Sequence, residues 1–188
     1  IYVLGHSLGG TAAPRIARQA PSLAGIILMA GSPRPLEDLM VEQFTYLFSL
    51  NGGPSAEQTA QLEAIKTQVA RIKDPNLDLQ TPPADLMGAN AAYWLDLRSY
   101  NPAQVAASLP QRMLVLQGQR DYQVLAAADF TAWQSALAGK TNATFKLYPA
   151  LNHLFISGEG PSTPQEYEKA GKVSSEVIQD IASWNKTR

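Results

Sequence analysis

Hydrophobic and polar positions along the chain predict strands that alternate with helices. Short apolar or alternating runs are typical of strands, and they occur at residues 1–4, 24–30, 112–116 and 144–148. Apolar residues at helical spacing predict helices, and outside the middle of the chain they occupy residues 11–19, 130–137 and 173–184. Strands joined by helices favour a parallel sheet with helices packed on its faces, so we expect an α/β fold.

The middle of the chain interrupts this alternation. Between residues 36 and 100 the pattern is mainly helical, with breaks at NGGP and at the proline-rich TPP. Helices are expected over residues 36–50, 55–73 and 85–97, and Ser55 fits the cap of the second. We therefore interpret residues 1–35 and 101–188 as a core and residues 36–100 as a helical cap inserted into it.

Composition narrows the class of protein. The chain has 188 residues, a length that suits one domain or a domain with an inserted subdomain. A net charge of −1 gives no indication of binding to nucleic acid or to an acidic membrane surface, and no apolar run is long enough to span a bilayer. Without cysteine there is neither a disulfide framework nor a thiolate metal site, and the compartment, cytoplasmic or exported, stays open.

The first apolar run ends in GHSLGG, a pattern with chemical meaning. Gly5 and Gly9 lack Cβ atoms, so the strand and the following helix can approach closely, which leaves Ser7 at the apex of a strained turn. This arrangement is typical of the G-x-S-x-G nucleophile elbow. The first N–H groups of the helix, including that of Leu8, favour negative charge beside the serine. The alternative is a serine that only caps the helix, and the motif by itself leaves both open.

A nucleophilic serine needs a base, and the chain has two histidines. His6 adjoins Ser7, and because adjacent side chains on such a turn diverge, we expect it to pack beneath the turn. His153 follows the TFKLY strand, at the strand end where parallel sheets place their catalytic groups. His153 is therefore the predicted base.

The base needs an orienting acid. Asp121 directly follows the MLVLQG strand and is the predicted acid. Asp129 ranks behind it because it suits a helix cap, and Glu159 lies in a glycine-rich loop beyond the histidine.

Ser7, Asp121 and His153 occur in the chain order of the α/β-hydrolases. The sequence resembles the second half of such a protein: GHSLGG is similar to the elbow, LVLQGQRD to the acid loop and LYPALNHLF to the histidine loop. It is similar to the bacterial esterase and serine-aminopeptidase-like group, whose members are often exported or multidomain. The resemblance covers essentially the whole chain. It implies an α/β-hydrolase fold with a Ser-His-Asp triad and a lid in place of residues 36–100.

The chain departs from this family at its start, because the strands that precede the elbow are absent. We therefore expect a fragment whose elbow strand forms an exposed apolar edge. The N-terminal half of the fold on another chain would cover that edge, or the chain would self-associate through it. Leu8 can supply one N–H to an oxyanion, whereas the second donor has no candidate in this sequence.

The expected reaction is hydrolysis of a small-molecule acyl ester through an acyl-enzyme intermediate, with no metal or organic cofactor. We expect Phe44, Tyr93 and Trp94 either to contact the substrate or to form the core of the cap. Phe155 adjoins the base and is a further candidate for contact with the substrate. A thioesterase or an aminopeptidase-like enzyme would use the same triad. Carboxylates that could hold a peptide's ammonium group are Glu37, Asp38 and Glu42. A non-catalytic binding module on the same scaffold is the alternative of another class.

Overall fold

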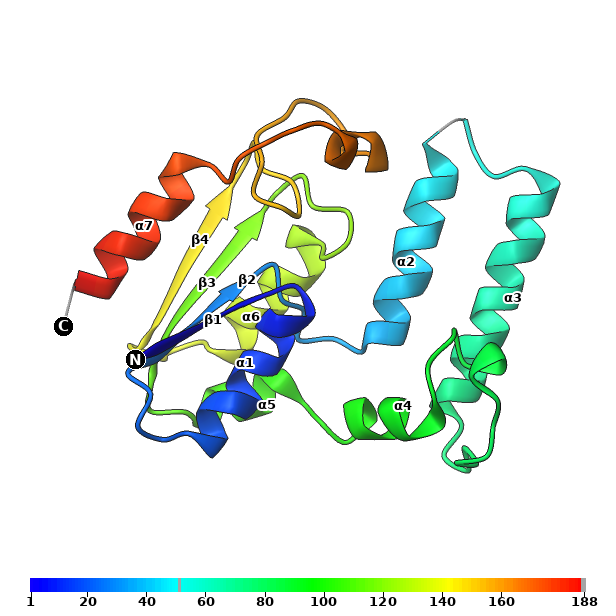
Figure 1. The fold of residues 1–188 in the computed structure, drawn as a ribbon, viewed down its shortest axis with the longest axis horizontal. Helices are drawn as coiled ribbons and strands as arrows, with labels where there is room; N and C mark the ends of the chain where they lie inside the picture. The colour runs from blue at the N-terminus through cyan, green and yellow to red at the C-terminus, as the bar shows by residue number, and fades with distance from the viewer. Residues whose placement is uncertain (51, 187–188) are drawn as a thin grey trace. The chain divides into compact units, whose positions relative to one another are not determined.

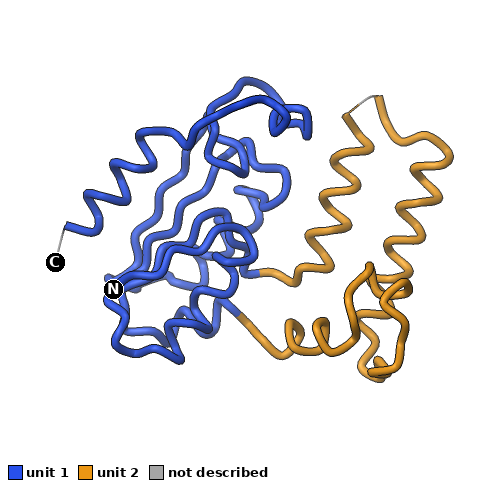
Figure 2. The backbone as a smooth tube through the Cα atoms, in the orientation of Figure 1, with its two compact units in different colours: residues 1–33, 102–188 blue, residues 34–101 orange. Residues whose placement is uncertain are grey.

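A computed structural model describes residues 1–50 and 52–186 of the chain (Figure 1). These residues fall into two compact units, which Figure 2 distinguishes by colour. Unit 1 consists of residues 1–33 and 102–188, and unit 2 consists of residues 34–101. Each unit has its own elements and its own core.

Unit 1 contains a four-stranded sheet in which every described pair of neighbours is parallel. The strands lie in the order β1, β2, β3, β4, and they span Tyr2–His6, Gly25–Met29, Arg112–Gly118 and Ala143–Tyr148. Because the strands are parallel, their carboxyl ends, which follow His6, Met29, Gly118 and Tyr148, lie along one edge of the sheet. The predicted α/β fold is confirmed.

Helices cover both faces of this sheet (Figure 1). The helices of unit 1 are α1 (Leu8–Gln19), α5 (Pro102–Ser108), α6 (Thr131–Ala136) and α7 (Ser175–Lys186). Two shorter helical segments are η2 (Ala126–Phe130) and η3 (Pro164–Glu168). Neither α5 nor η3 was expected from the apolar pattern, because both are too short to show a helical period.

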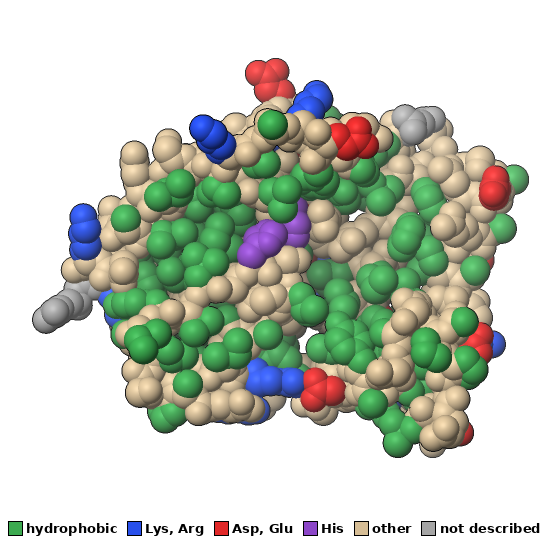
Figure 3. Space-filling model, in the orientation of Figure 1, with side chains coloured by type: hydrophobic (Ala, Val, Ile, Leu, Met, Phe, Trp, Pro, Cys, Tyr) green, Lys and Arg blue, Asp and Glu red, His purple; other side chains and the backbone are tan. Residues whose placement is uncertain are grey.

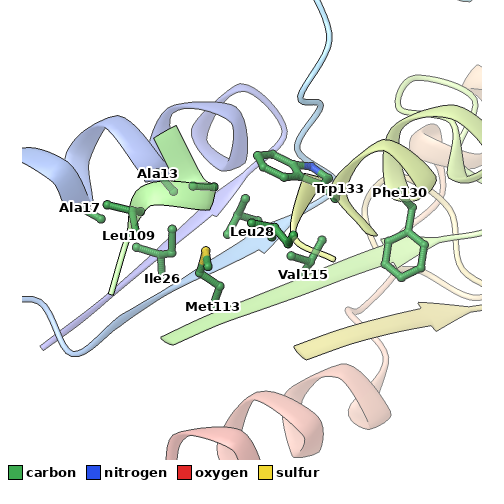
Figure 4. Packing of buried hydrophobic residues seen from close by; sticks show 11 residues of the cluster. Ala13, Ala17, Ile26, Leu28, Leu109, Met113, Val115, Phe130 and Trp133 are labelled. Atoms are coloured by element: carbon green, nitrogen blue, oxygen red, sulfur yellow. The ribbon is translucent and has the colours of Figure 1, made fainter. Parts of the chain in front are cut away.

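The core of unit 1 follows the alternation of side chains along each strand. On one face, Ile26, Leu28 and Met113 pack against residues of α1, α5 and α6, including Trp133 (Figure 4). On the other face, the intervening residues of the strands pack against α7. A sheet that is buried on both sides needs continuous apolar strands, which explains why β2 and β3 read as unbroken apolar runs.

β1 differs from the other strands because it lies at the edge of the described sheet. Ile1 is 93% exposed and Leu4 is 50% exposed. The apolar edge expected at the elbow strand is thus exposed in the structure. The physical reason is that, within the described residues, β1 pairs with β2 alone and its second side has no neighbouring strand.

Unit 2 is helical and consists of α2 (Leu36–Ser49), α3 (Ala56–Lys73), η1 (Pro83–Asp85) and α4 (Ala91–Arg98). Its core contains Ile72, Leu86 and Trp94. Ser55 caps α3 through a capping box, as expected. The third helix was expected from residue 85, but α4 begins only at Ala91, because Met87 and Gly88 adopt positive φ and break the helical path.

Candidate active site

Ser7 lies between β1 and α1 in a strained backbone conformation, with φ 55° and ψ −122°. Its amide donates to the carbonyl oxygen of Met29 at 2.8 Å, which ties the turn to the end of β2. Among the described residues, the Ser7 side chain makes no capping hydrogen bond to α1. A capping role therefore does not explain this serine, and Leu8, the first residue of α1, presents an N–H that has no partner within its helix.

Glycines make the turn possible, but not the pair that the motif indicates. A Cβ on Gly5 would lie 2.1 Å from the carbonyl oxygen of Gly9, so no side chain fits there. A Cβ on Gly9 would meet no described atom within 4 Å. Gly10 is the second tight position, because its Cβ would lie 3.0 Å from the Cα of Gly31 in the loop after β2. The expected role of Gly9 thus belongs to Gly10.

His153 and Asp121 form a hydrogen-bonded pair at the carboxyl edge of the sheet. The Nδ1 atom of His153 lies 2.8 Å from Oδ2 of Asp121, and both residues are buried. The backbone amides of Gln123 and Val124 donate to Oδ1 of Asp121 at 2.8 and 3.0 Å. These donors hold the carboxylate in place, so that it can accept from the imidazole and leave Nε2 of His153 free to accept a proton.

A further donor to this carboxylate was missed in the sequence. The side-chain amide of Gln117 donates to Oδ2 of Asp121 at 2.9 Å, the same oxygen that faces His153. Gln117 is 2% exposed and also donates to the carbonyl oxygen of Val124. The available signal was a single polar residue in the otherwise apolar run MLVLQG, because a buried amide requires partners.

The acid and base loops meet because β3 and β4 are parallel neighbours. The amide of Gln119 donates to the carbonyl oxygen of Tyr148, and that of Arg120 donates to Leu151. A Cβ on Gly118 would lie 2.5 Å from the carbonyl oxygen of Leu151, so a glycine is needed for this close approach.

A second set of contacts joins the same two loops through Glu166 of η3. Arg120, next to the acid, forms an ion pair with Glu166. Asn152, next to the base, donates from its side-chain amide to Oε2 of Glu166 at 3.0 Å, and the Ser162 hydroxyl donates to the same oxygen. Burial alone would raise the pKa of Glu166, but its hydrogen bonds with Arg120, Asn152 and Ser162 hold that pKa below its usual value.

His6 lies against the base, which differs from the simple packing expected of it. Its Nε2 atom lies 2.8 Å from the carbonyl oxygen of His153, and the centroids of the two rings are 4.7 Å apart. The two histidine side chains are adjacent in Figure 3, next to a region of hydrophobic side chains. The ring of Phe155 also lies near His6, with ring centroids 6.3 Å apart in an edge-to-face arrangement.

Asp129, the rival acid, belongs to a different network. It is fully buried, and its carboxylate accepts from the Ser32 hydroxyl at 2.5 Å and from the amide of Leu125 at 2.7 Å. Ser32 in turn is bonded to the side chain of Thr11 in α1. Asp129 therefore connects η2 to the elbow helix, whereas Asp121 is the carboxylate that contacts His153.

The predicted substrate-contacting residues have different surroundings. Phe155 is 0% exposed and lies in the core of unit 1, so this placement gives no support to contact with a substrate. Trp94 is buried in the core of unit 2 and donates from its indole to the carbonyl oxygen of Leu86. Tyr93 and Phe44 are half-buried in the same unit.

Two of the three carboxylates proposed for an ammonium group are paired with cations inside unit 2. Glu42 accepts two hydrogen bonds of 2.7 Å from the Arg34 guanidinium, which lower its pKa. Asp38 forms an ion pair with Lys73. Glu37 is buried.

Among the described residues, no group of three or more histidine, aspartate or glutamate side chains could hold a metal ion. No helix in this part of the chain has the length and apolarity to cross a membrane.

Comparison with known proteins extends this description. The chain is 41% identical over 186 residues to Esterase EstD from Thermotoga maritima, and the aligned region covers 98% of this chain and 42% of that protein. The chain thus spans less than half of the length of this relative. No family model matches the chain.

Two solved structures show the same fold at low sequence identity. A thermophilic esterase from Thermogutta terrifontis is 20% identical, with a TM-score of 0.51, over 99% of this chain and 64% of that chain. A monoacylglycerol lipase from Paleococcus ferrophilus is 19% identical, with a TM-score of 0.50, over 97% of this chain and 66% of that chain.

The parallel sheet flanked by helices, together with these two structures, defines an α/β-hydrolase fold. The alignment with EstD extends along nearly the whole chain. The chain therefore has an α/β-hydrolase fold, and the relative that aligns along 98% of it is named as an esterase.

Proposed function

We propose that this chain carries the nucleophile, the acid and the base of a serine hydrolase that cleaves acyl esters. The observation that carries the proposal is the hydrogen bond between His153 and Asp121, at the same edge of the sheet as the strained turn of Ser7. Fold alone would not establish an activity, because the same scaffold can serve other functions. A buried imidazole that is oriented by a carboxylate is suited to act as a general base.

In the proposed reaction, the Ser7 hydroxyl attacks the ester carbonyl while Nε2 of His153 takes its proton. Asp121 holds the proton of His153 on Nδ1 and stabilises the imidazolium that forms. The Leu8 N–H donates to the tetrahedral oxyanion. His153 then protonates the leaving alcohol, and a water molecule, activated by the same base, hydrolyses the acyl-enzyme. We also propose unit 2 as the cap, with Phe44 and Tyr93 as candidates for contact with the acyl group.

Two observations favour an ester over a peptide substrate. A peptidase that recognises a free amino terminus needs a carboxylate to hold the ammonium group, but Glu42 and Asp38 are paired with cations. The name of EstD also points to esters. A thioester substrate would use the same residues in the same roles.

Labelling with a fluorophosphonate probe tests the proposal without knowledge of the substrate, because the probe reacts with activated serines. We expect one adduct by intact mass on the chain and none on Ser7→Ala. Ser135→Ala is the matched control, because Ser135 is an exposed serine on α6, and this variant should still be labelled. Folded protein without an adduct, or an adduct that survives in Ser7→Ala, would contradict the proposal and favour a non-catalytic binding module.

Substrate class follows from turnover of matched chromogenic substrates. We expect hydrolysis of p-nitrophenyl esters and little or no hydrolysis of aminoacyl p-nitroanilides. The opposite preference would assign the chain to the peptidases.

A further inference from the structure

We infer that His6 is a positioning residue that holds the loop of the base against the turn of the nucleophile; this inference rests on the proposed function. His6 precedes Ser7 in the chain, and its Nε2 atom contacts the carbonyl oxygen of His153 at 2.8 Å. The contact joins residues 147 positions apart in the sequence. One side chain thus connects the backbone of the proposed base directly to the neighbour of the proposed nucleophile.

The chemistry of this contact determines where the proton of His6 lies. A carbonyl oxygen only accepts hydrogen bonds, so Nε2 of His6 must carry a hydrogen. Nδ1 of His153 faces the carboxylate of Asp121, which also only accepts when ionised. The two rings therefore carry their protons on different nitrogens: His6 on Nε2 and His153 on Nδ1. The second arrangement leaves Nε2 of His153 able to accept the serine proton.

The backbone of His6 is well placed for this role. It is the last residue of β1 and pairs in register with Met29 of β2. The rings of His153 and Phe155 both pack near its imidazole, with centroids 4.7 and 6.3 Å away. A side chain fixed by a strand and by two rings can transmit its position to the loop that it contacts. Because misplacement of a catalytic group by about 1 Å can cost about 10²-fold in rate, this contact affects catalysis even though His6 takes no proton from Ser7.

If the His6 side chain acted only through packing, a different effect of substitution would be expected. Two substitutions distinguish the positioning role from the packing role. His6→Phe keeps a flat ring of similar size but removes the donor. His6→Gln removes the ring but keeps an N–H donor at a similar distance from the backbone. A positioning hydrogen bond requires the donor, so Gln should preserve the function better than Phe. Packing requires the ring, so Phe should preserve it better than Gln.

The first measurement is steady-state hydrolysis of a p-nitrophenyl ester by the wild-type chain, His6→Phe and His6→Gln, with Ser7→Ala as the blank. We expect kcat of His6→Phe to fall by about tenfold or more while KM stays within about twofold, because His6 contacts the base loop and not the substrate. His6→Gln should stay within a few-fold of wild type. Equal kcat values for His6→Phe and the wild type would overturn the inference, as would a larger loss in His6→Gln than in His6→Phe.

The second measurement needs no turnover, so the inference can fail or hold independently of the proposed function. The chain has only two histidines, so a ¹⁵N–¹H spectrum of the imidazole rings contains only two ring systems. We expect one ring protonated on Nε2, with a coupling across the hydrogen bond to the carbonyl carbon of His153, and one protonated on Nδ1. In His6→Phe the Nδ1 proton of His153 should exchange faster with water. A His6 ring protonated on Nδ1, or unchanged exchange at His153, would overturn the positioning role.

Discussion

Asp121 and Asp129 are both buried carboxylates, eight positions apart, whose partners give them different roles. Asp121 faces His153 and receives donors that hold it there. Asp129, a residue of η2, accepts from the amide of Leu125 at the start of η2 and from the hydroxyl of Ser32 in the loop after β2. The contacts of Asp121 orient the His153 imidazole, whereas those of Asp129 connect η2 to the loop after β2.

Substituting each aspartate by asparagine should separate these roles. We expect Asp121→Asn to lower kcat by about 10³–10⁴-fold, because an asparagine no longer selects the Nδ1–H tautomer of His153. Asp129→Asn should lower the free energy of unfolding by about 1–3 kcal/mol, because a buried donor loses its acceptor, with turnover little changed. Ester hydrolysis and urea denaturation of both variants check this. Near-normal turnover in Asp121→Asn, together with loss in Asp129→Asn, would move the role of the acid to Asp129.

At the scale of elements, the two glycines of the elbow motif, Gly5 and Gly9, have different neighbours at the turn between β1 and α1. Gly5 faces the backbone of α1 at a distance that excludes a Cβ, whereas the Cβ position of Gly9 is open within the described residues. A glycine in a helix costs about 0.5–1 kcal/mol relative to alanine, so Gly9 is the position where alanine should be tolerated.

We therefore expect Gly9→Ala to unfold at the same temperature as the wild type or slightly higher, and to keep its label with the fluorophosphonate probe. Gly5→Ala should unfold at a clearly lower temperature and lose the label, because strand and helix must move apart. Thermal unfolding and labelling of the two variants form a matched pair. A greater loss in Gly9→Ala than in Gly5→Ala would contradict the geometry of the turn.

The free edge of β1 has a consequence for association. An edge strand with exposed apolar side chains can pair with another strand, and Leu4 is 50% exposed beside this edge. We propose that a further strand covers this edge.

For the chain alone, we expect a mass in sedimentation equilibrium that rises above that of one copy with increasing concentration. Leu4→Lys should reduce this association, because a charge on an edge strand opposes pairing. Leu79→Lys is the control, because Leu79 is a comparably exposed leucine, at 61%, in unit 2. A monomer mass at every concentration would contradict the expectation, as would equal effects of the two substitutions.

Regular elements with long apolar patterns could be predicted from the sequence, and short or polar ones could not. The strands and the helices α1, α2 and α3 carry periodic patterns, so they were found to within a few residues. The start of α4 was misplaced because positive φ at Met87 and Gly88 breaks a pattern that reads as helical.

Within the candidate site, the pairing of His153 with Asp121 was predicted because each follows a strand that could be recognised. The contacts of His6, Gln117 and Glu166 were not predicted. Each depends on which backbone atoms the folded loops bring together, and a single sequence has no local pattern that indicates such contacts.

At the scale of the whole chain, Glu166 links stability to pH. Its pKa in the folded protein lies below the usual value of 4.5. A group whose pKa is lowered by folding stabilises the folded state fully above its unfolded pKa, and this contribution is lost as the pH falls through the folded value. The contacts of Glu166 with Arg120 and Asn152 should therefore weaken in acid.

The comparison of Glu166→Gln with the wild type measures this contribution. We expect the variant to be less stable at pH 7 and the difference in free energy of unfolding to shrink as the pH falls below about 4.5. Urea denaturation at a series of pH values checks the sign. A difference that is constant with pH, or that grows in acid, would show that the ionised carboxylate of Glu166 does not stabilise the fold.

The backbone conformation of Ser7 also bears on which residue type is expected at this position. A φ of 55° with a ψ of −122° is unfavourable for a residue with a side chain, at about 1–3 kcal/mol, whereas glycine adopts such angles readily. A chain selected only to fold would therefore drift toward glycine at position 7. A serine at such angles is what selection for the hydroxyl, rather than for stability, would produce.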